Sequence, residues 1–569
     1  MTSIFISTYN AAKLFYANRE KYKFKWIITD KISVSEFFNA NQIRCILLSK
    51  YINEKHYKNI FRSKYSEFNN LLLKLDQQTY AKKLNKKFNL NFYNTFRYLG
   101  NRDFAGLKIL EFTLNRVIKI KKIKKIIFFD GIEGNIFGKN FYAIVLQASL
   151  KNKVIFENEK HKTLKKKEHL HNLFNNISKL FFIKNYSIQF FYFIKKKITE
   201  LYPFKSREGN ILIFEPLFDL YYFPYKINNT LFCKSFNFDN SENFLNKNKI
   251  KKEFKKFRNH KYLVNYLFNL MEQNKDYSIK KILYIKQIVK KNKVKRILLG
   301  CDPNPILGNI IKHAAKFNVK IIGCQHGGGY LVQNYDEEHI DSDYNFCDYF
   351  LSYGSSNKIN KRIKKKILNI GSFKSNFYDQ TINPQKKKLE KNNILFIPTE
   401  VSPMSTPTIE IIQDKRFTLQ KEICRYLNLS KKEIYIKVLK NYDLFPIINH
   451  IKKNHKDFKI EYSTINQSIK TLRPKIIILD YLGTTLYQAL YSDAKIILFL
   501  DKYNMPKQDV LKILKKRVFV VKNINELKSL WPTIDNTNLK TDNMFLDNFF
   551  KFKSNYLMEQ KYKKIIYGN

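Results

Sequence analysis

The stretch with the clearest chemical character is GCQHGGGYLVQNYDEEH, Gly323 to His339, which sets a histidine beside three consecutive glycines. Glycine makes up only 16 of the 569 residues, so a run of three needs a backbone reason. Glycine adopts positive φ and lets the main chain approach another group closely, as a tight turn beside a ligand requires. The imidazole of His326 is suited to act as a general base or to donate a hydrogen bond to a phosphate. We therefore predict a functional loop here; the alternative is a histidine that only orders the glycines.

A second candidate lies in KIIILDYLGTT, where an apolar run ends at Asp480 and a helical pattern begins after Gly483. The N–H groups at a helix N-terminus attract anions, and the hydroxyls of Thr484 and Thr485 add hydrogen-bonding groups. The same threonines are also ordinary N-cap residues, and the two roles are compatible. We predict that this turn contacts a phosphate-bearing ligand.

The elements that position these residues follow a strand, helix, strand rhythm, which predicts parallel sheets covered on both faces by helices. The rhythm is clearest in the C-terminal third and recurs less cleanly earlier. The strands are predicted at residues 44–49, 125–130, 210–215, 296–302, 319–327, 393–398, 434–438, 458–462, 475–480, 495–500 and 517–521. The fold class is α/β, with two doubly wound Rossmann-like domains facing a cleft.

The domain boundaries follow shifts in composition. A polar, lysine-rich stretch with Pro384 separates the two halves, and the sheet pattern ends after Trp531. We expect an N-terminal domain over 1–375 with a helical, Lys- and aromatic-rich insertion, a linker over 376–391, a C-terminal domain over 392–530 and a helical tail over 531–569.

Composition narrows the classes of partner. Lys plus Arg number 104 and Asp plus Glu 48, a formal net charge of +56 that favours phosphates, anionic lipids or acidic sugars. No nucleic-acid motif accompanies this charge, so we expect no nucleic-acid partner. Six cysteines without any C-x-x-C spacing argue against a zinc ribbon and fit a reduced, cytoplasmic compartment. The start has no secretory pattern, and no apolar stretch is long enough to span a bilayer.

The pattern resembles the GT-B glycosyltransferase fold, and more narrowly the bacterial surface-carbohydrate transferases of the capsule and lipopolysaccharide type. The matching residues are IIGCQHGGGY (Ile321 to Tyr330), DYFLSYG (Asp348 to Gly354), NIGS (Asn369 to Ser372) and IIILDYLGTTLYQAL (Ile476 to Leu490). Their order and spacing match over Arg296 to Leu500, and the first 290 residues match loosely.

The resemblance implies roles for particular residues. The loop that holds His326 faces the cleft, so His326 and Glu133, in DGIEGN, are the two candidates for the catalytic base; Glu133 is equally suited to the N-terminus of a helix. In the second half Ser402 and Ser405 lie in a loop that could close over donor phosphates. Lys437 matches a position where related enzymes place a basic residue for those phosphates, although chance placement competes in so basic a chain.

One position departs from the pattern. Many relatives carry an acidic residue after this helix begins, where this chain has Gln488. An amide still hydrogen-bonds a hydroxyl, but the change puts the donor or catalytic competence in doubt. The predicted nucleotide and phosphate ligands are therefore Gly327, Gly328, Ser402, Ser405, Lys437, Asp480, Gly483, Thr484, Thr485 and Gln488.

The resemblance implies a cytoplasmic enzyme, with a peripheral contact to the inner face of the membrane, that moves a sugar from a nucleotide-activated donor to a glycan or lipid-linked acceptor. It implies no built-in metal and no bound cofactor, because lysines, glycine amides and a helix N-terminus can neutralise the leaving diphosphate. The alternatives are a nucleotide-sugar epimerase, a polyol-phosphate transferase and a non-catalytic protein that binds anions or nucleic acid.

Overall fold

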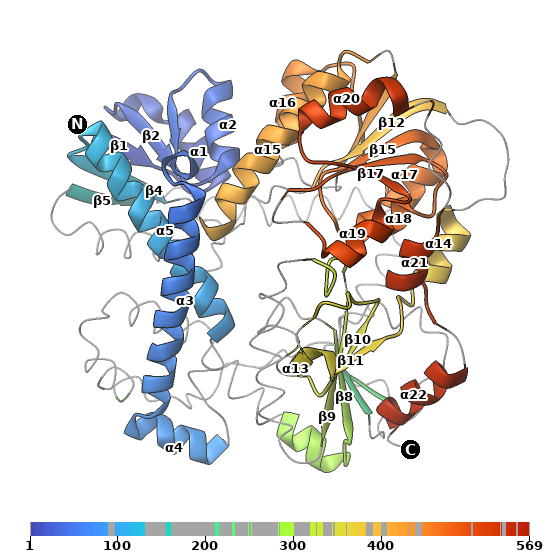
Figure 1. Ribbon diagram of the computed structural model, residues 1–569. Helices are drawn as coiled ribbons and strands as arrows, with labels where there is room; N and C mark the ends of the chain where they lie inside the picture. The colour runs from blue at the N-terminus through green and yellow to red at the C-terminus, as the bar shows by residue number, and fades with distance from the viewer. Residues whose placement is uncertain are drawn as a thin grey trace, which may run out of the picture. The chain divides into compact units, whose positions relative to one another are not determined.

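The computed structural model contains three parallel sheets among its described residues (Figure 1). It describes residues 2–88, 97–130, 155–160, 211–214, 230–233, 249, 252, 283, 285–300, 319–325, 327–333, 344, 347–359, 361–382, 391–399, 407–430, 432–438, 446–501, 505–534, 536, 542–553 and 556–567. The predicted α/β class is confirmed. Within the described residues no helix is both long and apolar enough to cross a membrane.

The chain divides into two compact units. The first contains residues 1–204, 235–283 and 402–414, and the second contains 205–234, 284–401 and 415–569. The sequence analysis expected one Rossmann-like domain over 1–375. The structure differs, because this range holds two separate sheets that fall in different units.

The first sheet lies in the first unit and has the strand order β3-β2-β1-β4-β5. Helices α1 (Tyr9–Ala17) and α2 (Ile32–Ala40) connect its early strands. Phe15 of α1 and Phe38 of α2 pack with Ile4, Ile27 and Phe129 from the strands in a fully buried core. The strands are β1 (Thr2–Phe5), β2 (Trp26–Thr29), β3 (Cys45–Leu47), β4 (Lys125–Asp130) and β5 (Ile155–Lys160).

Three longer helices also belong to this unit. They are α3 (Glu54–Asp76), α4 (Thr79–Phe88) and α5 (Arg97–Lys121), and α3 packs along α5 (Figure 1). Asn53 caps α3 by accepting a hydrogen bond from the His56 N–H at 2.9 Å. The helical insertion was expected at about 154–207 and again at about 246–281. Part of it is a strand, since β5 covers 155–160; the rest lies almost wholly outside the described residues.

The second sheet belongs to the second unit and has the order β11-β10-β9-β8-β6-β7. Counted from β6, this is the flavodoxin-like order 2-1-3-4-5 with one further strand. Ile211, Leu298, Ile322 and Leu351 form its core. The strands are β6 (Ile211–Phe214), β7 (Thr230–Cys233), β8 (Arg296–Gly300), β9 (Lys320–Cys324), β10 (Tyr349–Ser352) and β11 (Ile367–Asn369), with the short helix α13 (Lys361–Lys364) before β11.

The third sheet, in the same unit, has the order β14-β13-β12-β15-β16-β17, which is the Rossmann order 3-2-1-4-5-6. Its strand order reverses between β12 and β15. The strands are β12 (Lys391–Ile397), β13 (Glu433–Lys437), β14 (Lys459–Glu461), β15 (Pro474–Leu479), β16 (Lys495–Phe499) and β17 (Val518–Val521). The connecting helices are α15 (Pro407–Leu427), α16 (Pro446–Asn454), α17 (Ile465–Leu472), α18 (Thr484–Ala489) and α19 (Gln508–Leu514), and α20 (Ile524–Ile534) follows β17.

Two further segments join the sheets of the second unit. The expected linker begins with a helix, α14 (Ser375–Ile382), which packs on α17; residues 383–390 lie outside the described ones. The tail holds α21 (Met544–Phe549) and α22 (Tyr556–Tyr567). The tail returns to the second sheet, where the Arg296 side chain donates to the Ile565 carbonyl at 3.0 Å and Ile566 is buried in the core.

Candidate functional site

The carboxyl ends of the strands in the second and third sheets face each other within the second unit. The loop after β9 meets the turn between β15 and α18: the Gly328 N–H donates to Thr484 Oγ1 at 3.0 Å. Five residues further on, Gln333 Nε2 donates to the Leu482 carbonyl, also at 3.0 Å. The two segments that the sequence analysis singled out separately are therefore in direct contact.

A second set of hydrogen bonds joins the carboxyl edges of the second and third sheets beside this contact. The Lys507 N–H donates to the Val332 carbonyl at 2.8 Å. The carboxylate of Asp509, at the start of α19, accepts from Ser356 Oγ at 2.8 Å and from the Asn357 N–H at 2.8 Å. Partial burial opposes ionisation, but these hydrogen bonds hold the pKa of Asp509 below its ordinary value.

The loop after β9 contains Gly327, Gly328 and Gly329 and is called the glycine loop below. It requires glycine because it comes very close to the turn before α18. A Cβ atom on Gly328 would lie 2.6 Å from the carbonyl carbon of Gly483 and 2.7 Å from the Tyr487 ring. Gly329 has a φ of 97°, in the region that favours glycine. The loop thus depends both on the positive φ that glycine adopts and on its lack of a side chain. The atoms that it approaches closely belong to the edge of the third sheet.

Gln325 holds this loop in place, a role that the sequence analysis did not assign to it. Its side chain is buried; Nε2 donates to the Gly327 carbonyl at 2.7 Å and Oε1 accepts from the Tyr353 N–H at 2.9 Å. The amide therefore ties the glycine loop to the end of β10. The only signal in the sequence was a glutamine two residues before a run of glycines.

Asp480 lies at the end of β15, where the third sheet's strand order reverses. Its carboxylate is buried and both oxygens are engaged: Oδ1 accepts from the Thr399 N–H and Oδ2 from Gln420 Nε2, each at 2.6 Å. Gln420 also donates to the Thr399 carbonyl at 2.8 Å. Asp480 was predicted as a phosphate-site ligand; here its carboxylate joins the loops that follow β12 and β15.

Lys437 ends β13 and is buried, with its ammonium donating to the Val438 carbonyl at 2.5 Å. Burial lowers its pKa, and the nearby Glu461 opposes the shift. The predicted phosphate ligand is therefore at a strand's carboxyl end, as expected, but its Nζ contacts the protein's own main chain.

The remaining described candidates cluster on α18. Gly483 is its N-cap and offers no side chain, and Thr484 and Thr485 in the first turn are half-buried. Gln488 Nε2 donates to Asn466 Oδ1 of α17 at 2.9 Å, so its amide contacts a neighbouring helix. The other predicted residues, His326, Glu133, Ser402 and Ser405, lie outside the described residues.

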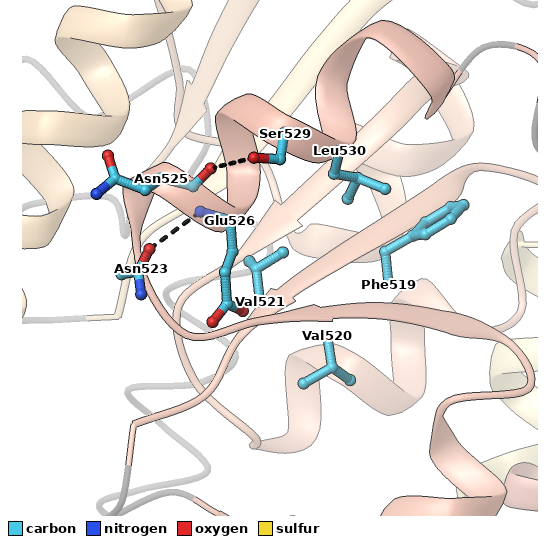
Figure 2. Close-up of a pocket in the computed structure, with 8 residues that line it drawn as sticks. All are labelled: Phe519, Val520, Val521, Asn523, Asn525, Glu526, Ser529 and Leu530. Atoms are coloured by element: carbon cyan, nitrogen blue, oxygen red, sulfur yellow. Dashed lines mark hydrogen bonds between the residues drawn. The ribbon is translucent and has the colours of Figure 1, made fainter.

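A separate hollow lies between β17 and α20 (Figure 2). Its polar groups complete the helix itself: Asn523 Oδ1 accepts from the Glu526 N–H at 3.0 Å, and Ser529 Oγ donates to the Asn525 carbonyl at 3.1 Å. None of the predicted site residues lines it. Among the described residues no group of three or more His, Cys, Asp or Glu side chains could hold a metal ion.

The chain is similar to several solved structures at low identity. A UDP-GlcNAc 2-epimerase from Neisseria meningitidis bound to UDP-GlcNAc is 10% identical over 51% of this chain and 81% of its own, with a TM-score of 0.34. The lipopolysaccharide outer core galactosyltransferase WaaB is 11% identical over 51% and 80%, with a TM-score of 0.31. MurG from Acinetobacter baumannii is 9% identical over 51% and 78%, with a TM-score of 0.32.

No curated protein matches the chain in sequence. A family model does, and the description of that family is LIC12162 family transferase. The match runs over residues 128–515, more than half of the chain, and includes the glycine loop after β9 and the turn before α18. The predicted enzyme class, a transferase, is thereby confirmed: the chain belongs to the LIC12162 family of transferases.

Proposed function

We propose that this transferase is a glycosyltransferase, which moves a sugar from a nucleotide-activated donor to a glycan or lipid-linked acceptor of surface-polysaccharide synthesis. One observation carries the proposal. The glycine loop after β9 and the turn before α18 belong to different parallel sheets and meet at the carboxyl ends of both, with Gly328 bonded to Thr484. Ligands of such sheets bind outside the carboxyl ends of the strands, so donor and acceptor would be brought together at this junction.

The donor would lie on the third sheet's side of the junction. The charge that develops on a leaving nucleotide must be neutralised, which the N–H groups of the first turn of α18 and the Thr485 hydroxyl can do. His326 and Glu133 remain the candidates for the base that activates the acceptor hydroxyl, and Ser402 and Ser405 the candidates for a loop over the phosphates. The net charge of +56 supports a peripheral contact with anionic lipids, where a lipid-linked acceptor would be found.

The test is a thermal-shift screen against UDP-, GDP-, CDP- and CMP-linked sugars and the free nucleotides, because a ligand bound only by the folded state raises the unfolding midpoint. We expect a rise with one nucleotide family. T485V removes a hydroxyl at nearly constant shape and should reduce the rise. T533V, at an exposed position on α20, is the matched control and should leave the rise unchanged.

Two outcomes would contradict the proposal. The first is that no nucleotide raises the midpoint of the wild-type protein. The second is that H326A and E133A both leave surface glycan at wild-type levels in cells. Conversion of the donor sugar to its epimer without any acceptor would instead support the epimerase alternative.

A further inference from the structure

A cationic side chain that the sequence analysis did not single out lies at the carboxyl edge of the third sheet. The guanidinium carbon of Arg416 lies over the ring of Tyr481, 5.1 Å from its centroid. Arg416 is on α15, the helix that follows β12, and Tyr481 is the second residue after β15. The strand order of this sheet reverses between β12 and β15, which is where ligands bind in open α/β sheets.

The position of Arg416 is fixed by its neighbour one turn along the helix. Residues four apart lie on the same helix face, so Arg416 shares a face with Gln420. Gln420 is buried and bonded to the Thr399 carbonyl at 2.8 Å and to Asp480 at 2.6 Å. This face of α15 is therefore bonded to the loops after β12 and β15. Arg416 lies on the same face and contacts the ring of Tyr481.

The chemistry of Arg416 suits a diphosphate better than that of Lys437. The Lys437 ammonium is buried, its pKa is lowered by that burial, and it donates to a main-chain carbonyl. Arg416 is half-buried, and a guanidinium is a planar cation with five N–H donors in a rigid fork. A guanidinium whose face lies on an aromatic ring presents its N–H donors in one plane, the geometry that binds two phosphate oxygens at once.

We propose that Arg416, held on the ring of Tyr481, binds the phosphates of a nucleoside diphosphate at the point where the strand order of the third sheet reverses. This inference rests on the proposed function, because it requires a donor that carries a diphosphate.

The experiment is calorimetric titration of the full chain with the nucleoside diphosphate that gives the largest thermal shift, and with the matching nucleoside, at fixed salt. We expect R416A to weaken diphosphate binding by about 10-fold or more, since it removes charge-assisted hydrogen bonds to the phosphates. Nucleoside binding should not change. R416K keeps the positive charge but not the planar set of N–H donors, so its affinity for the diphosphate should lie between those of the wild type and R416A.

The ring has its own test. Y481F keeps the aromatic face and should bind the diphosphate like the wild type, whereas Y481L should weaken diphosphate binding in the same direction as R416A. If Y481L binds as tightly as the wild type, Tyr481 does not hold the guanidinium in place and that part of the proposal fails.

K415A is the matched control, because it removes one positive charge from an exposed neighbouring position on the same helix. If R416A and K415A weaken binding equally, the effect is that of net charge and the inference is wrong. If the wild-type protein binds no nucleotide at all, the proposed function fails with it. Should R416A unfold, R416K and Y481L still decide the inference, because both keep most of the side-chain volume.

Discussion

Gly327 and Gly328 are neighbours in one run, yet an added Cβ atom would meet different surroundings at the two positions. At Gly328 the nearest atom is the main-chain carbonyl carbon of Gly483 at 2.6 Å, which cannot move without its strand and helix. At Gly327 the nearest atom is Thr484 Oγ1 at 3.6 Å, an ordinary contact. The run therefore contains one position that requires glycine for space and one that tolerates a methyl group.

This difference gives a prediction with its own internal control. G328A should lower the free energy of unfolding by about 1–3 kcal/mol, because overpacking forces the backbone to shift. G327A should change it by less than about 0.5 kcal/mol. Urea denaturation of the two variants without ligand measures both values. Equal effects would mean that the close approach of the loop to α18 is absent in solution.

Individual side chains also mark what sequence could and could not predict about the site. Asp480 and Lys437 are at strand carboxyl ends, as the alternation of apolar runs predicted. Their partners were not predictable, because the groups that bond Asp480 lie 81 and 60 residues away in the chain. Local spacing gives a residue's place on an element, but distant donors and acceptors decide whether its polar atoms contact a ligand or the protein.

Among the helices, α16 and the turn after it carry a pair of imidazoles, of which His450 is half-buried and His455 is buried. The rings of His450 and His455 lie 5.3 Å apart, and His455 stacks on Phe458. The Nε2 atom of His450 and both ring nitrogens of His455 are buried with no hydrogen-bond partner among the described residues. Burial lowers the pKa of His450 to about 4, and His455, Lys421 and Arg425 add repulsion.

The lowered pKa predicts acid lability of this part of the molecule. The folded state holds His450 neutral, whereas the unfolded chain protonates it near its ordinary pKa of 6.5. The stabilising contribution is therefore present above about pH 6.5 and is lost as pH falls towards 4. H450F removes the titrating group at similar side-chain volume. Its thermal unfolding midpoint should therefore fall less than that of the wild type between pH 6.5 and 4. A decline identical to that of the wild type would contradict the prediction.

The strands show why some elements were predictable and others were not. β15 and β16 are buried apolar runs, and both predictions are confirmed. β10 (Tyr349–Ser352) and β1 (Thr2–Phe5) have only four residues each and were not predicted as strands. Length alone does not account for this, because the equally short β6 (Ile211–Phe214) and the three-residue β3 (Cys45–Leu47) were predicted. The strand conformation of β1 and β10 comes from parallel pairing with neighbours distant in sequence. The pairing also decides which sheet each strand joins: β1 pairs with β4 in the first sheet, and β10 pairs with β9 in the second.

Across the whole second unit, the C-terminal tail joins the two sheets. Phe550 stacks on Tyr487 at 4.5 Å and on Tyr378 at 5.8 Å, beside the third sheet's helices. Its carbonyl accepts from the Ser372 N–H at 2.7 Å, and the Lys553 N–H donates to the Ile370 carbonyl at 2.9 Å, after β11 of the second sheet. The last helix then buries Ile566 in the second sheet's core. The junction that would hold the ligands is thus fastened by residues 180 or more positions beyond Ile370 in the chain.

Ile566 tests whether α22 is part of this structure in solution. I566A should lower the free energy of unfolding by about 2–5 kcal/mol, because it leaves a cavity at a side chain with no exposed surface. Y556A is the control on the same helix, since Tyr556 is 72% exposed and its truncation should cost less than about 0.5 kcal/mol. Hydrogen exchange should show faster exchange in β8 to β11 of I566A than in the control, because these strands lose the packing that covers them. If the two variants exchange alike, the tail does not support the second sheet.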